Sequence, residues 1–203
     1  MSKSNLIIPS QKELESRFSF INNKVLRVNI VIAFRYIIFL INIESDLKLP
    51  GAILYSLYKD IILYTATIVE SCIHYCLKEY IDSGQLKSTD IMPYEWKDSV
   101  CKDLYLISED EKVCGVIRHK VSEHFTDKTQ FKTLNEACLK ANLFDKSLFD
   151  KAENLRNIRN NIHLVALKRT DDYYEKKDTQ EAFEIAKTII ERVENKLMKL
   201  QKI

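Results

Sequence analysis

The residues best suited to chemistry lie between positions 155 and 164, which read L-R-N-I-R-N-N-I-H-L. Arg156, Asn160 and His163 are spaced by four and three residues, so on a helix they stack on one face. An arginine can bind a phosphate through two parallel hydrogen bonds and stabilise negative charge as it develops. An imidazole near its ordinary pKa can take up or release a proton at neutral pH. The cluster therefore predicts proton transfer beside a bound phosphate.

Arg159 lies four residues before His163 and adds a second guanidinium group to this cluster. A neighbouring face of the same predicted helix is apolar and would pack on a core. Its residues are Leu148, Ala152, Leu155, Ile158, Ile162 and Ala166. The spacing also has a structural reading. A histidine at a helix edge is more often hydrogen-bonded within the fold than catalytic, and both arginines could pair with acids of a neighbouring helix.

Local charge favours a phosphate ligand, although the chain as a whole is almost neutral. The formal net charge is +2, so a nucleic acid would have to be bound by a local basic patch. Across residues 146–169 the basic residues outnumber Asp150 and Glu153, which predicts a phosphate-attracting strip or, alternatively, an ordinary solvated face. The strip comprises Lys146, Lys151, Arg156, Arg159, Lys168 and Arg169. We expect Lys151, Lys168 and Arg169 to bind a nucleic-acid backbone.

Composition predicts a single all-α domain over residues 1–203. The chain is 46% hydrophobic and 30% charged, which is typical of a soluble globular protein. Three glycines and three prolines are too few for the many tight turns of an all-β fold. Apolar periodicity predicts an up-and-down helical bundle with a long first helix. The helices are expected at about 11–43, 52–82, 129–142, 145–167 and 179 to near residue 200.

Three further features complete the predicted architecture. Residues 1–10 are expected to form a flexible arm, and Gly84 is placed where a left-handed helix cap is expected. Residues 85–125 are expected to be an irregular or hairpin insertion, because two short β-prone segments flank the acidic turn 108–111. A short helical excursion is the alternative in this insertion.

The cysteines and the longest apolar stretch bear on location and on metals. Five cysteines, with no signal peptide before them, predict reduced thiols in a cytoplasmic protein. Cys72 and Cys76 are one helical turn apart, but no second pair with zinc-site spacing follows, so we expect core residues and no metal or cofactor. The apolar stretch from Asn29 to Ile43 is too short to span a bilayer and contains Arg35. It predicts a buried or dimer-facing helix and no membrane partner.

The segment Leu155–Leu164 resembles the signature of HEPN domains, in which an Arg, commonly followed by a polar residue such as Asn, precedes a His. Arg156-Asn157 and His163 match this signature with six residues between Arg and His. The context is similar as well, because a long helix carries an internal acid, Glu70, and a Phe-x-x-Leu helix (131–134) precedes the motif. The likeness extends over residues 52–200 as an architecture.

The resemblance implies a metal-independent endoribonuclease that acts as a homodimer, in a toxin–antitoxin or phage-defence role. His163 would move the protons, Arg156 or Arg159 would bind the phosphate, and Asn160 would orient the imidazole or donate to the phosphate. Glu70 is expected to pair with Arg156 or Arg159, and Asn157 to support the motif. One histidine cannot easily serve as base and acid at once, so two motif helices would face each other across a two-fold axis. The products would carry a 2′,3′-cyclic phosphate and a 5′-hydroxyl.

Two other functions fit the same residues. One is a non-catalytic HEPN module that binds RNA, nucleotide or a protein partner, such as an antitoxin, through the same arginines. The other is a helical scaffold in which the motif residues form a buried polar network. The remaining histidines, which we expect to be structural or on the surface, are His74, His119 and His124.

Overall fold

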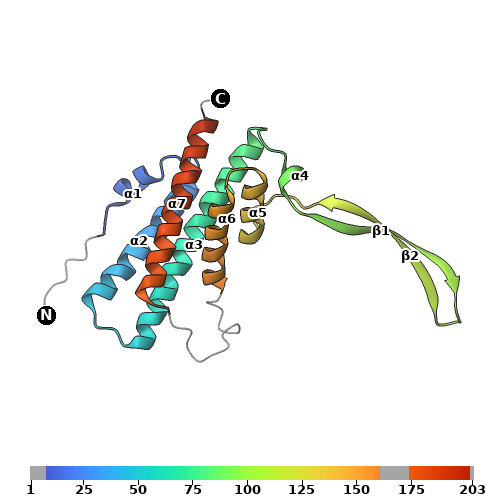
Figure 1. Ribbon diagram of the computed structural model, residues 1–203, viewed down its shortest axis with the longest axis horizontal. Helices are drawn as coiled ribbons and strands as arrows, with labels where there is room; N and C mark the ends of the chain where they lie inside the picture. The colour runs from blue at the N-terminus through green and yellow to red at the C-terminus, as the bar shows by residue number, and fades with distance from the viewer. Residues whose placement is uncertain (1–7, 161–173, 202–203) are drawn as a thin grey trace.

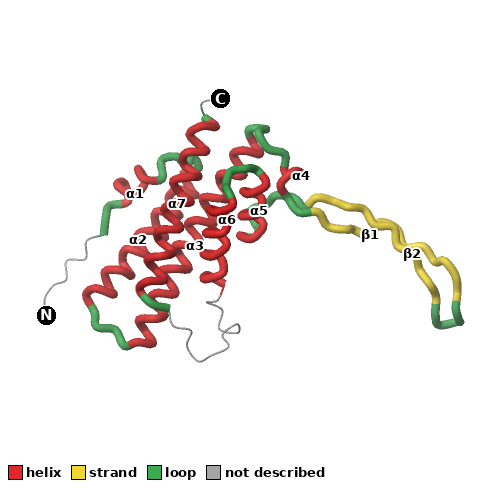
Figure 2. The backbone as a smooth tube through the Cα atoms, viewed as in Figure 1, coloured by secondary structure: helices red, strands yellow, loops and turns green. Residues whose placement is uncertain are grey.

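The computed structural model describes residues 8–160 and 174–201 and shows a helical bundle with a projecting β-hairpin. Its long helices run alternately up and down, as Figures 1 and 2 show. The predicted all-α class is therefore confirmed for the bundle and needs one correction, the two-stranded sheet. The elements are α1 (Gln11–Arg17), α2 (Lys24–Asp46), α3 (Gly51–Asp82), α4 (Ser88–Ile91), β1 (Tyr94–Leu106), β2 (Lys112–Ser122), α5 (Phe131–Lys140), α6 (Lys146–Asn160) and α7 (Lys176–Leu200).

Helix α3 is the centre of the bundle and packs against α2, α5, α6 and α7. Most of its apolar side chains are buried, although Ile53 and Tyr64 remain exposed. Ile73 and Leu77 are fully buried, and each such side chain stabilises the fold by about 1.5–3 kcal/mol. Cys72 is also buried, and desolvation raises the pKa of its thiol to about 12, which keeps it protonated. It is a core residue, as predicted.

The predicted helix 11–43 is wrong in one respect, because residues 18–23 divide it into α1 and α2. The Asn23 side chain caps α2 by accepting a hydrogen bond from the Leu26 N–H. The Asn22 N–H is bound by the hydroxyl of Tyr75 on α3, at 3.0 Å. Ile21 just before it is fully buried. The break is therefore fixed by tertiary contacts that helical periodicity does not register.

Other boundaries agree more closely with the sequence. Gly84 has φ +75°, the left-handed conformation expected of a cap after α3. α7 begins three residues earlier than expected, because Glu175 and Asp178 form reciprocal hydrogen bonds at its start. The start of α6 agrees with the predicted helix 145–167, and the positions after 160 in that helix lie outside the described residues.

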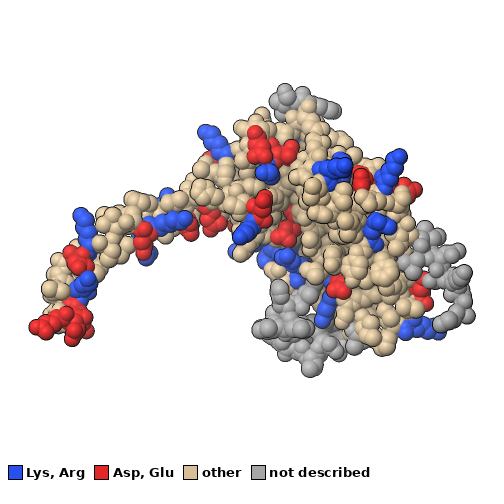
Figure 3. All heavy atoms as spheres, turned by 180° about the vertical axis from the view of Figure 1, so that it is seen from behind, with Lys and Arg blue, Asp and Glu red and all other residues tan. Residues whose placement is uncertain are grey.

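The insertion is a hairpin, so the helical alternative is wrong for most of it. β1 and β2 pair antiparallel around the predicted acidic turn, with irregularities between Asp98 and Val100 and between Asp103 and Tyr105. Every residue of β1 is exposed, and the hairpin projects away from the bundle in Figure 1. Figure 3 shows charges of both signs along it and acids at its tip, where Glu109–Glu111 lie. A two-stranded ribbon of this kind contributes little to the core.

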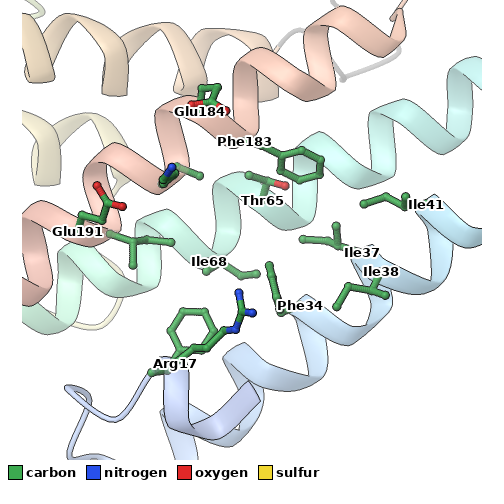
Figure 4. A pocket seen from close by; sticks show the side chains of 14 residues that line it. Arg17, Phe34, Ile37, Ile38, Ile41, Thr65, Ile68, Phe183, Glu184 and Glu191 are labelled. Carbon is green, nitrogen blue, oxygen red and sulfur yellow. The ribbon is translucent and has the colours of Figure 1, made fainter. Parts of the chain in front are cut away.

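Helix α2 is apolar nearly all round but thinly covered. Its most apolar 18-residue window has a mean hydropathy of 1.8, and 22% of that window is buried. By length and composition, α2 and the segment Ile53–Asp82 of α3 could each cross a membrane. The apolar stretch 29–43, judged too short from the sequence, is therefore only part of a helix that is long enough to span a bilayer. The α3 segment is the core helix just described, whereas α2 borders an apolar cavity of about 460 Å³ shared with α3 and α7 (Figure 4).

The hairpin can be removed without unfolding the bundle. At its base the Glu123 N–H donates to the Pro93 carbonyl at 2.9 Å, so a two-residue Asn-Gly turn can replace residues 94–122. We expect the midpoint of thermal unfolding, followed by helical circular dichroism, to move by no more than about 5 °C, because the excised side chains are outside the core. Loss of a cooperative transition in the shortened chain would contradict this, and Leu155→Ala in the core is the destabilised reference.

Candidate functional site

A polar cleft of about 330 Å³ opens where α3, α6 and the loop before α5 meet. Arg156, Arg159 and Asn160 line it from α6, and Glu70 lines it from α3. The structure therefore brings together the described members of the predicted cluster. Lys128 and Lys132 from the other wall make the lining richer in basic than in acidic side chains.

Glu70 forms the predicted ion pair with Arg159. The Arg159 Nη2 lies 3.3 Å from the Glu70 Oε2, and both side chains are partly buried. Desolvation raises the pKa of the Glu70 carboxyl, while Arg159 and then His74 oppose this. Within the part of the chain that the structure describes, this is the only ion pair of Arg159.

Arg156 makes a different set of contacts. Its Nε and Nη2 bind Glu153 at 2.9 and 2.8 Å, and its Nη2 also donates to Asn157 at 2.9 Å. Glu153 in turn accepts a 2.7 Å hydrogen bond from Asn135, which is fully buried on α5. Arg156 thus belongs to a polar network that joins α6 to α5. Asn157 supports it, as expected.

The remaining predicted site residues divide into two groups. Lys151 is exposed on α6 but does not line the cleft, so the structure does not bring it to the motif. The other three, His163, Lys168 and Arg169, lie outside the described residues. Asn160, at the described end of α6, is three positions before His163.

Sequence reasoning missed the wall that faces α6. Lys128 and Lys132 flank the start of α5, whose N-cap residue Gln130 makes no side-chain capping hydrogen bond. The first turn of α5 contains no acid, so its backbone N–H groups and helix dipole are not offset at this end. The available signal was two lysines bracketing the predicted helix start.

His74, near the cleft, has a structural role, as predicted. Its Nε2 lies 3.0 Å from the Thr126 carbonyl oxygen, and its ring stacks on Phe125 with centroids 4.7 Å apart. These contacts tie the loop before α5 to α3 and so help to fix the cleft wall. His119 and His124 are exposed, as expected of surface histidines.

Comparisons of the chain with family models, with curated proteins and with solved structures gave no match. The functional argument therefore rests on the residues of the cleft and on the motif.

Replacing Glu70 or Glu153 by glutamine should affect the free energy of unfolding in different ways. The pKa of Glu70 is raised in the fold, so its contribution to stability falls as pH rises from about 4.5 through that raised value. Glu70→Gln should then match or exceed the parent's free energy of unfolding at pH 7, and its advantage should shrink on acidification below that window.

Glu153→Gln is the matched comparison. An amide there sets an N–H group against either Arg156 or buried Asn135, both of which are donors, and should lower the free energy of unfolding by about 1–3 kcal/mol. Urea denaturation of the two variants across pH 4–8 measures both effects. Equal losses of stability for the two variants at pH 7 would contradict the different roles given to Glu70 and Glu153.

Proposed function

We propose that this chain is a HEPN-type, metal-independent endoribonuclease whose active site is the cleft beside α6. The observation that carries the proposal is the placement of Arg159 by Glu70 in a cleft that Arg156 and Asn160 also line. The Arg-x6-His motif and the up-and-down helical bundle support it. On the resemblance, the expected role is that of a toxin or phage-defence nuclease, with an antitoxin as a further protein partner.

The chemistry assigned to the cleft is transesterification of an RNA phosphodiester. The ribose 2′-oxygen attacks phosphorus, its proton passes to an imidazole, and the bond from phosphorus to the 5′-oxygen breaks. The departing 5′-oxygen receives a proton, which leaves a 2′,3′-cyclic phosphate and a 5′-hydroxyl. Arg159 binds the phosphate and offsets the charge that builds on its oxygens in the transition state. Asn160 orients the imidazole of His163.

Phosphates flanking the reacting one have binding groups on the opposite wall. Lys128 and Lys132 are exposed there, and the uncapped start of α5 presents backbone N–H groups. A helix N-terminus of this kind favours an anion. These groups explain how a chain of net charge +2 can bind RNA locally.

A homodimer supplies the second imidazole that acid–base catalysis requires. A base must take the 2′ proton while an acid protonates the 5′-oxygen, and each chain offers one motif histidine. Two copies related by a two-fold axis would present two histidines to one RNA strand. A non-catalytic module that binds RNA, nucleotide or protein through the same cations is the second candidate, favoured by the number of cations in the cleft.

Removing the imidazole tests the catalytic proposal. His163→Ala should abolish cleavage of a labelled RNA in the presence of a chelator, with binding retained within about tenfold because the cations of the cleft remain. His119→Ala on the exposed hairpin is the matched control and should cleave like the parent. If His163→Ala cuts as well as the parent, the assignment is wrong. RNA binding by the parent chain with no product selects the non-catalytic module.

A second experiment should distinguish the roles of Arg156 and Arg159. Arg159→Gln should lower kcat/KM by about 100-fold, because its donors serve the ligand. It should destabilise the fold less than Arg156→Gln does, because Glu70, whose pKa is already raised by desolvation, can take up a proton when its cation is lost. Arg156→Gln should lower the free energy of unfolding by about 1–3 kcal/mol, since Glu153 loses its cation beside buried Asn135. Single-turnover kinetics and urea denaturation measure the two effects. A cleavage rate that falls only for Arg156→Gln would overturn this assignment of roles to the two arginines.

A further inference from the structure

The five cysteines, all within the described residues, fall into two classes that differ in exposure. Three of them lie in the core of the bundle, where desolvation raises the pKa of each thiol and keeps it protonated. These are Cys72, Cys76 and Cys138. The other two, Cys101 on β1 and Cys114 on β2, are exposed on the projecting hairpin (Figure 1). Of the five thiols, this pair is therefore the one that an oxidant in solution can reach.

Cys101 and Cys114 lie on one face of the ribbon as diagonal neighbours. Cys101 is paired with Val116. Cys114, two positions before Val116 on the same strand, is paired with Asp103, and a step of two positions returns a side chain to the same face. The two thiols already interact, since the pKa of Cys114 is raised first by its hydrogen bond to Asp103 and also by Cys101. The register therefore places two exposed sulfurs next to each other.

The ribbon can bring these sulfurs to bonding distance. Diagonal neighbours have Cα atoms about 7–8 Å apart, slightly more than the separation of about 4.4–6.8 Å that is usual across a disulfide. Register irregularities lie on both sides of the pair, just before Val100 and just after Asp103. Every residue of β1 is exposed, so a small shift of the strands meets no core packing. An exposed disulfide of this kind is easily reduced again, which makes the bond reversible.

We propose that Cys101 and Cys114 form a reversible disulfide between the two strands when a hydroperoxide reaches the hairpin. The sulfur of Cys101 attacks the peroxide, the oxygen–oxygen bond breaks, and water leaves as Cys101 becomes a sulfenic acid. The sulfur of Cys114 then attacks the sulfur of Cys101, the sulfur–oxygen bond breaks, and a second water leaves. Two thiols and one hydrogen peroxide thus give one disulfide and two water molecules.

Asp103 sets the order in which the two thiols react. The Cys114 Sγ donates a hydrogen bond to the Asp103 Oδ1 at 3.2 Å, which holds the proton on Cys114 and leaves Cys101 to attack the peroxide. The Asp103 Oδ2 accepts from the Lys112 ammonium at 3.0 Å. Lys112 first and then Cys114 lower the pKa of Asp103, so its carboxyl is ionised at neutral pH. When Cys114 attacks, this carboxylate accepts the thiol proton and passes it to the departing hydroxide.

Mild oxidation followed by mass spectrometry tests the disulfide. After an equivalent of hydrogen peroxide, the intact parent chain should lose the mass of two hydrogen atoms, and trypsin should release residues 98–102 joined to residues 113–118. Dithiothreitol should reverse both changes. Cys101→Ser and Cys114→Ser should instead gain oxygen or link two chains together, because neither can close the bond within one chain. Cys138→Ala, which removes a buried thiol, is the matched control and should lose two hydrogen atoms as the parent does.

A parent chain that only gains oxygen, links to a second chain or does not react would overturn the disulfide. Asp103→Asn tests the proton transfer separately. Its bond should close at least about tenfold more slowly, and the sulfenic acid on Cys101 should accumulate, where dimedone can trap it. Asp103→Glu should recover most of the rate, because it restores a carboxylate. An Asp103→Asn chain that closes the bond at the parent's rate would overturn the role given to this carboxylate.

Discussion

A carboxylate on the central helix of the bundle constrains the rest of the site. Glu70 lies beside Val69, and Val69 and Cys72 are fully buried, so its charge is partly desolvated and needs a cation nearby. Arg159 is that cation. Leu155, one turn earlier on α6, is fully buried in the core. The two contacts together fix how α6 is rotated against α3, and Asn160, beside Arg159, lines the cleft with it.

The two arginines of the motif are therefore not equivalent. The resemblance favours Arg156, whose spacing to His163 matches the family pattern. The contacts favour Arg159, because Arg156 is committed to Glu153 and through it to buried Asn135. A guanidinium that holds two helices together has fewer donors for a ligand than one with a single partner. In the proposed function, Arg156 would therefore support the geometry of the cleft and Arg159 would bind the phosphate.

The sequence predicts local features well, because they depend on neighbouring residues. The apolar stripe of α3, the cap at Gly84 and the acidic turn of the hairpin are of this kind. The break between α1 and α2 is not a local feature, since the Tyr75 hydroxyl that binds Asn22 is 53 residues away in the sequence. The lysine wall of the cleft was also missed, because a loop can be placed only when its tertiary contacts are known.

The hairpin is exposed all along β1, and its charges bear on what it could bind. Three hairpin cations are already neutralised, by pairs such as Arg118 with Asp98 at 2.7 Å and Lys112 with Asp103 at 3.0 Å, and the tip is acidic. A ribbon with this pattern attracts little phosphate, even though its aromatic side chains resemble a stacking platform for bases. In the proposed function RNA binding therefore falls to the cleft, where the cations outnumber the acids.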